Sequence, residues 1–235
     1  MMATQARHER TEALIGTAGL EKLQESHVLV AGLGGVGSAC AVSLARGGIG
    51  TLVLIDCDEI EISNLNRQAI AFMDTIGMRK TDAARKFVGR IDPDMHVILI
   101  DEHISPDTIE AVFERAGEVD YIVDAIDDAP AKIALALWAQ EHGIPLVSCM
   151  GTARKLHPEL LEFADLFETH DCPLCRSMRS RCRKAGVERL TVLFSPETPF
   201  GPNGPVLGTT SFTPPIAGEM LAGYVIRALL GIDGN

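Results

Sequence analysis

The first residues with a chemical pattern are glycines that follow an apolar run. HVLVAG (27–32) leads into GLGGVG, which contains Gly32, Gly34, Gly35 and Gly37. Glycines spaced in this way permit a tight turn and a close approach of the backbone to a ligand. The N-terminus of the helix that should follow offers N–H groups to phosphate. The loop therefore predicts a nucleotide or dinucleotide site without saying which.

Carboxylates follow the next apolar run, TLVLID (51–56). Asp56 lies 24 residues after Gly32, where a carboxylate accepts hydrogen bonds from ribose hydroxyls, and Asp58 comes two residues later. A nicotinamide-dependent dehydrogenase would carry the same carboxylate. The choice between nucleotide chemistries therefore depends on the residues that come next.

A polar cluster after this run favours the splitting of a triphosphate. Its members are Asn64, Arg67 and Gln68 in SNLNRQ (63–68), Lys80 at the start of the next expected helix, and Arg10 near the N-terminus. Fixed cations and donors stabilise the charge that grows on a departing pyrophosphate, whereas hydride transfer needs no such cluster. Taken singly, Asp58 could form a turn, Asn64 could cap a helix and Lys80 could face solvent. Their joint order along the chain favours one phosphate site.

Two further carboxylates, Asp124 and Asp127, belong to DAIDD at the end of another apolar run. A carboxylate in this place could hold Mg²⁺ against the phosphates of a nucleotide. We expect Asp124 to help bind the nucleotide and Asp127 to bind the metal.

The elements that position these residues alternate between two periodicities. Strands are expected at 27–32, 51–56, 96–101, 120–125, 144–149 and 190–194, and helices at 11–25, 36–46, 79–90, 105–116 and 129–142. Strands alternating with helices predict a Rossmann-like, doubly wound, mostly parallel α/β sheet. With 235 residues and 46% hydrophobic content, we expect a single domain over 1–235, with a nucleotide-binding half (1–150) and an elaborated substrate and dimer half (151–235).

The second half contains a basic segment in an acidic chain. The segment 176–189 carries a charge of +5 within a total of −11, through Arg176, Arg179, Arg181, Arg183, Lys184 and Arg189 against Glu188. Such a patch could bind a polyanion locally, while the acidic remainder opposes loose binding to nucleic acid; a solvated helix face is the alternative. PETPFGPNGP (196–205) predicts a mobile loop.

Six irregularly spaced cysteines without an evident export signal predict reduced thiols. Cys172 and Cys175 form CPLC, half of a possible zinc site whose second pair is absent. Cys172 is the best candidate for a reactive thiol, because neighbouring arginines would lower its pKa. Simple packing of these cysteines is the alternative.

Two observations bear on location. The N-terminal decapeptide is polar, and the most apolar segment, 216–230, is short and carries Glu219 and Arg227. We expect that segment to be a buried helix, with no contact to a membrane and a cytoplasmic location for the protein.

GLGGVG, LIDCDEIEISNLNRQ, GMRK and DAIDD, in this order, resemble the adenylation motifs of the ubiquitin-activating and sulfur-carrier-activating superfamily. The resemblance implies a ThiF-type adenylation domain with ATP and Mg²⁺. It assigns the ribose to Asp56, the phosphates to Asn64, Arg67 and Lys80, and magnesium to Asp127. It also implies a homodimer in which Arg10 reaches the neighbouring subunit's site.

RHERTEALIG (7–16), HDCPLCRSMRSRCRKAGVERL (170–190) and SFTPPIAGEMLAGYVIRALLG (211–231) resemble the tRNA threonylcarbamoyladenosine dehydratase family. This resemblance implies ATP-dependent cyclisation of threonylcarbamoyladenosine in tRNA through an acyl-adenylate, with the basic segment on the tRNA and a sulfur-transfer protein as a further partner to consider. Two alternatives stay open. One is an adenylyltransferase for the C-terminal glycine of a ubiquitin-like sulfur carrier, and the other is a nicotinamide-dependent dehydrogenase or a nucleotide sensor.

Overall fold

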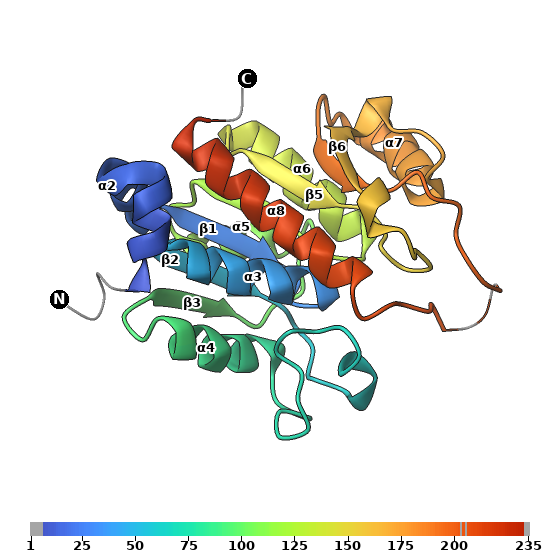
Figure 1. The fold of residues 1–235 in the computed structure, drawn as a ribbon. Coiled ribbons are helices and arrows are strands. Elements are labelled where there is room, and N and C mark those ends of the chain that lie inside the picture. The colour runs from blue at the N-terminus through green and yellow to red at the C-terminus, as the bar shows by residue number, and fades with distance from the viewer. Residues whose placement is uncertain (1–6, 203, 205, 233–235) are drawn as a thin grey trace.

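The computed structural model describes residues 7–202, 204 and 206–232, and in it a seven-stranded sheet forms the centre of the molecule (Figure 1). The strand order is β3-β2-β1-β4-β5-β7-β6, in which β6 is antiparallel to β7 and the other neighbours are parallel. The strands are β1 His27–Ala31, β2 Thr51–Ile55, β3 His96–Ile100, β4 Tyr121–Asp124, β5 Leu146–Cys149, β6 Glu162–Asp165 and β7 Thr191–Phe194. The predicted α/β fold class is confirmed.

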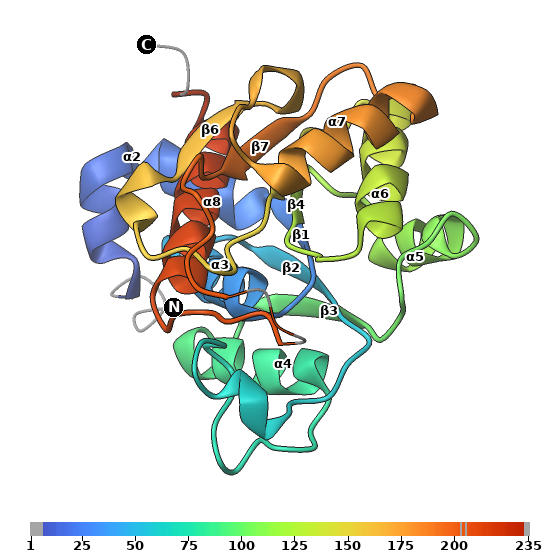
Figure 2. The same cartoon turned by 90° about the vertical axis from the view of Figure 1, so that its right-hand side faces the viewer.

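Helices cover both faces of this sheet (Figures 1 and 2). They are α2 Glu9–Glu25, α3 Gly35–Gly47, α4 Lys80–Ile91, α5 Ile109–Ala116, α6 Ala129–His142, α7 Pro173–Ala185 and α8 Thr213–Leu230, with 3₁₀ turns η1 Ile62–Asn64, η2 Pro158–Leu160 and η3 Leu166–Glu168. Successive strand residues point to opposite faces, so Val28 and Val30 join one buried cluster and Leu29 and Ala31 another. Apolar runs without alternation are thereby buried on both sides, as a parallel sheet requires.

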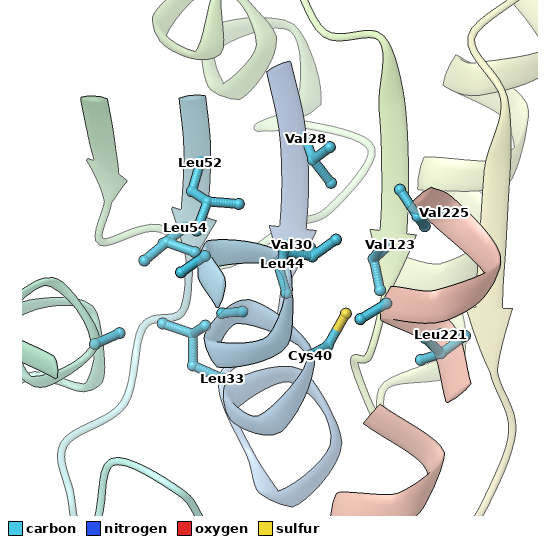
Figure 3. Packing of buried hydrophobic residues seen from close by; sticks show 14 of the residues in the cluster. Val28, Val30, Leu33, Cys40, Leu44, Leu52, Leu54, Val123, Leu221 and Val225 are labelled. Carbon is cyan, nitrogen blue, oxygen red and sulfur yellow. The ribbon is translucent and has the colours of Figure 1, made fainter. Parts of the chain in front are cut away.

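The predicted buried helix at 216–230 is α8, which lies against α3 over the first of these clusters. Leu221 and Val225 of α8 lie near Cys40 and Leu44 of α3 in Figure 3. A Cβ atom at Gly218 would lie 2.2 Å from the Val36 carbonyl oxygen, so a glycine lets the two helix backbones approach. In the part of the chain that the model describes, no helix has the length and apolarity needed to cross a membrane.

One predicted boundary is wrong. The helix expected from Ser105 begins at Ile109, because Ser105–Thr108 form a turn. The Thr108 hydroxyl accepts the Ser105 N–H at 3.0 Å and donates to the His103 carbonyl at 2.7 Å. Local bonding of this kind competes with the helix. Of the loop predicted at 196–205, residues 203 and 205 lie outside the described residues, and 196–202 are irregular.

The strand order reverses between β1 and β4, which lie side by side although two strands separate them in the chain. The connections from these strands leave in opposite directions, so a crevice forms at their carboxyl ends. Ligands of open α/β sheets bind in such a crevice. The residues that follow β1, β2 and β4 therefore converge on one place.

Candidate nucleotide site

The glycine loop connects β1 to α3 and crosses closely over the end of β4. Gly32 has φ +87°, and a Cβ atom there would lie 2.7 Å from the Ala125 carbonyl oxygen. A Cβ atom at Gly37 would lie 1.7 Å from the Gly32 carbonyl oxygen. Larger residues would force this turn apart, so both glycines are required by the backbone geometry.

Gly34 caps the N-terminus of α3 without any side-chain hydrogen bond. A Cβ atom at Gly34 would meet no atom within 4 Å, so this side of the loop is open. The first N–H groups of a helix lack intrahelical partners and carry the positive end of its dipole. Together these features create a place for phosphate.

Asp56, directly after β2, ties the glycine loop to the neighbouring loop. Its Oδ2 accepts the Leu33 N–H at 2.7 Å, and its Oδ1 accepts the Asp58 N–H at 2.9 Å. Oδ2 keeps a second lone pair for a ligand hydroxyl. The position fits the predicted contact with ribose.

Lys80 begins α4 and lies between two carboxylates. Its Nζ is 2.6 Å from Asp58 Oδ2 and 3.4 Å from Asp56 Oδ1. Burial acts to lower the pKa of Lys80, but the two carboxylates outweigh it and raise that pKa above its ordinary value. Lys80 is therefore a permanent, nearly buried cation, and Asp58 holds it in place.

Arg67 lies against the glycine loop, since a Cβ atom at Gly35 would be 3.0 Å from Arg67 Cγ. Its Nη1 donates to the Ser63 carbonyl at 3.2 Å and to Asn66 Oδ1 at 2.9 Å. These two intramolecular bonds hold the guanidinium in place, and its remaining N–H groups can bind a ligand. The approach of Arg67 to Gly35 brings Arg67 and the N-terminus of α3 together.

The two predicted amides differ. Asn64 closes a capping box at η1, where its Oδ1 accepts the Glu61 N–H at 3.0 Å, so the alternative reading of Asn64 as a cap is the one observed. Its Nδ2 makes only a 3.4 Å contact with the Ser63 hydroxyl. Gln68 is buried, and its Oε1 has no hydrogen-bond partner in the described part of the chain. A buried unpaired carbonyl is costly, so a ligand hydrogen at Gln68 would be stabilising.

The prediction that Asp124 binds the nucleotide is wrong. This carboxylate is 1% exposed, and its Oδ2 lies 3.0 Å from the Lys132 Nζ and 2.6 Å from the Ser148 hydroxyl. The lysine also donates to the Cys149 carbonyl at 2.8 Å. A buried charge needs an opposite charge and hydrogen bonds to offset its desolvation, and Lys132 and Ser148 provide these for Asp124 within the protein.

Asp127, in contrast, is exposed beyond the end of β4, and its side chain has no hydrogen bond or ion pair with any described residue. The sequence analysis missed Lys132; the available signal was a lone cation directly before the apolar run IALALW (133–138). Asp124 and Asp127 therefore have separate roles: Asp124 is paired inside the protein, and Asp127 is free for a ligand.

Arg10 lies far from this site in the same chain. It is exposed on α2, whose neighbour His8 is close to Gly48 at the C-terminal end of α3. The glycine loop is at the opposite end of α3 (Figure 1). Within one chain, Arg10 cannot touch a nucleotide bound at the glycine loop.

Most of the basic segment lies in α7, at the far edge of the sheet from α4 (Figure 2), and Arg189 follows the helix. Arg176, Arg181 and Arg183 are exposed, whereas Arg179 is half-buried. Nη1 of Arg179 donates to the Thr169 carbonyl at 2.8 Å and to the Thr169 hydroxyl at 2.5 Å. These bonds fasten α7 to the preceding loop, so Arg179 is held in place whereas Arg181 is exposed; the contact of Arg179 with substrate stays a prediction.

Cys172 is the N-cap of α7, where its Sγ accepts the Cys175 N–H at 3.4 Å. The hydrogen bond from the Cys175 thiol, the α7 N–H groups and the nearby charge of Lys155 together outweigh burial and lower the pKa of Cys172 to about 6. Lys155 is itself buried and donates to the Ser195 and Glu197 carbonyls. No pattern in the sequence pointed to Lys155. Within the described ranges, no group of three or more His, Cys, Asp or Glu side chains is placed to hold a metal ion.

Comparison with known proteins matches residues 7–235 to the ThiF family model. The chain is 35% identical over 239 residues to the tRNA threonylcarbamoyladenosine dehydratase of Bacillus subtilis, and the match covers 94% of this chain and 93% of that protein.

Solved structures of the Escherichia coli tRNA N6-threonylcarbamoyladenosine dehydratase are similar over nearly the whole chain at 28% identity. The complex with AMP has a TM-score of 0.90 and covers 97% of this chain and 95% of that one. The complex with ATP has a TM-score of 0.86 and covers 98% and 97%. The same fold and the same order of elements therefore hold an adenine nucleotide in this relative.

Proposed function

The chain belongs to the ThiF family, and we propose that it is an ATP-dependent tRNA threonylcarbamoyladenosine dehydratase. One observation carries the proposal: Asp56, Lys80 and Arg67 meet at the glycine loop, at the carboxyl ends of β1 and β2. This is a site for the sugar and phosphates of ATP. The 35% identity to a named dehydratase supports the choice of acceptor.

ATP would lie across the switch point between β1 and β4. Its ribose hydroxyls would bond to Asp56, and its phosphates would meet the N-terminus of α3 at Gly34 and Gly35. The amide of Gln68 would pair its buried oxygen with a ligand hydrogen. These contacts fix the α-phosphorus relative to the acceptor carboxylate.

Arg67 and Lys80 would stabilise the pyrophosphate as it leaves. The threonine carboxylate oxygen attacks the α-phosphorus, the bond from that phosphorus to pyrophosphate breaks, and an acyl-adenylate forms. Charge grows on the leaving oxygens, where a fixed cation acts most strongly. Because the pKa of Lys80 is raised, its ammonium keeps its charge throughout.

Ring closure then needs orientation more than acid–base chemistry. A nucleophile of the neighbouring urea attacks the activated carbonyl, the bond from carbon to AMP oxygen breaks, and a proton leaves to solvent. AMP carries away the oxygen that makes the sum a loss of water. A tethered nucleophile has a high effective concentration, so the absence of an evident catalytic triad in the sequence is no obstacle.

The donor set fits Mg²⁺ at Asp127 and not at Asp124. Mg²⁺ takes one or two carboxylates and completes its shell with phosphates and waters, which suits a single exposed carboxylate without a protein partner. Asp124 is closed off by Lys132. A bound Mg²⁺ would neutralise phosphate charge; the formation of AMP and pyrophosphate makes the first step ligase-like.

The tRNA would lie on α7, through Arg176, Arg181 and Arg183. The protein would act as a homodimer, because Arg10 can serve a nucleotide site only from a second copy. A sulfur-transfer protein as a further partner and a cytoplasmic location stay predictions, as does the division of the chain at residue 150.

The test is AMP and pyrophosphate release from ATP and Mg²⁺ with tRNA that carries threonylcarbamoyladenosine, compared with the same tRNA without it. We expect release only with the modified tRNA, and a nucleoside mass lower by one water. Lys80→Ala should abolish release, while Arg85→Ala, an exposed neighbour on α4 paired with Asp82, should leave it unchanged. Release that responds instead to a ubiquitin-like protein would move the function to the adenylyltransferase alternative.

A further inference from the structure

A cleft beside the nucleotide site opens between α4 and the loop that precedes it. Its volume is about 280 Å³, and Ile70, Met78 and Ala83 form apolar parts of its lining. This loop follows directly after Gln68 in the chain. The Ala71 N–H donates to the Gln68 carbonyl at 3.1 Å, so the chain turns as it leaves the nucleotide residues. Lys80, at the other end of the loop, begins α4. Ala83, one helical turn after Lys80, belongs to the lining, so one end of the cleft begins next to the nucleotide residues.

Two parallel aromatic rings line the cleft. Phe72 and Phe87 are stacked with ring centroids 5.9 Å apart and an angle of 8° between the planes. Phe72 is 45% exposed, so part of its ring is free for another planar group. Flat apolar rings of this kind are where unpaired bases stack in proteins that bind single strands.

The polar part of the lining is net positive. Lys86 and Arg90 are exposed residues one helical turn apart on α4, and neither has an ion-pair partner in the described part of the chain. The nearby Arg85 differs, since its guanidinium lies 3.7 Å from Asp82. Asp74 is the one acidic residue of the lining. Free cations beside an aromatic ring suit a phosphate backbone with an unstacked base.

α4, which lines the cleft, and α7 lie at opposite edges of the sheet (Figure 2), and β2 and β1, which lead into the nucleotide residues, come between these edges in the strand order. The order β3-β2-β1-β4-β5-β7-β6 has six gaps between neighbours, which at about 4.8 Å each put the outer strands about 29 Å apart. An RNA stem-loop that reaches both edges would be held on both sides of the reacting nucleotide.

Resting on the proposed RNA-modifying function, we propose that this cleft binds an unstacked nucleotide that flanks the modified adenosine. Its base would stack on Phe72, and the adjoining phosphates would pair with Lys86 and Arg90. An apolar side chain from a second copy of the chain would also fit the lining. The two unpaired cations favour the nucleotide.

The experiment measures the affinity of a stem-loop RNA that carries the modified adenosine, by fluorescence anisotropy over a series of salt concentrations. Phe72→Leu keeps apolar bulk but removes the ring, so we expect it to weaken RNA binding about 5- to 150-fold. Phe72→Tyr keeps an aromatic ring at this position and should bind the RNA with the wild-type affinity. The double variant Lys86→Gln/Arg90→Gln should reduce the slope of log affinity against log salt by about 1.4. Arg85→Gln is the matched control and should leave both quantities unchanged.

ATP affinity and sedimentation are measured on the same variants, and both should equal the wild-type values. One outcome would refute nucleotide binding in the cleft and leave the proposed function standing. In it, Phe72→Leu and the double variant bind RNA as the wild-type protein does, and the wild-type protein still releases AMP with modified RNA. Variants that shift the oligomeric state instead would assign the cleft to contact between copies, which also overturns the proposal. Loss of AMP release in the wild-type protein would refute the function separately.

Discussion

Replacing Lys132 by methionine should strongly destabilise the protein. Lys132 Nζ lies within 3.1 Å of Asp124 Oδ2, the Ser148 hydroxyl and the Cys149 carbonyl, and its side chain is 2% exposed. The methionine keeps the stem but leaves the Asp124 carboxylate buried without a cation. Loss of one partner of a buried ion pair costs about 3–5 kcal/mol. For a chain of this length we expect the melting temperature to fall by about 6–20 °C.

Two comparison variants make this test specific. Lys132→Met/Asp124→Asn removes the unpaired charge as well and should recover part of the loss. Lys184→Met replaces an exposed lysine on α7 and should change the free energy of unfolding by less than about 0.5 kcal/mol.

Thermal and urea unfolding, followed by circular dichroism, provide the measurement. A loss in Lys132→Met below about 1 kcal/mol, or equal to that in Lys184→Met, would refute the reasoning. The conclusion that Asp124 is an internal partner and not a nucleotide ligand would then have to be withdrawn.

Further predictions concern the glycine loop, the phosphate site and the thiol. Gly37→Ala should abolish the stabilisation of the protein by ATP, because its Cβ would overlap the Gly32 carbonyl, whereas Gly89→Ala on α4 has free space and should raise stability by up to about 1 kcal/mol in a thermal shift assay. Arg67→Ala should lower the rate of pyrophosphate release about 100- to 1,000-fold with an unchanged melting temperature; release at the wild-type rate would remove this residue from the site. The thiolate absorbance should titrate with a midpoint near the lowered pKa of Cys172, about 6, and be lost in Cys172→Ser. Since a lowered pKa stabilises the folded state above the ordinary value of 9.0, this contribution should fall as the pH drops from 9.0 through 6, and a midpoint at 9.0 would contradict the N-cap geometry.

The sequence predicted the fold class and the family, and both are confirmed. Apolar runs and glycines act through neighbouring residues, so HVLVAG and GLGGVG could be interpreted locally as a strand, a turn and a helix start. The predicted start of α5 was wrong because Thr108 forms hydrogen bonds with the backbone of the preceding turn. Motif order also brought Asp56, Arg67 and Lys80 to one place, since parallel strands end at the same edge of a sheet.

The sequence by itself determined which residue types gather at the carboxyl ends of the strands, through periodicity and spacing along the chain. Only the tertiary structure decided which of them are free to act. Asp124 and Asp127 are three residues apart, yet Asp124 is buried in an ion pair with Lys132 and Asp127 is exposed to solvent. Arg179 and Arg181 differ in the same way, because Thr169 holds only the first. Burial and pairing depend on neighbours that come together only on folding, and these set the cost of keeping a charge unpaired.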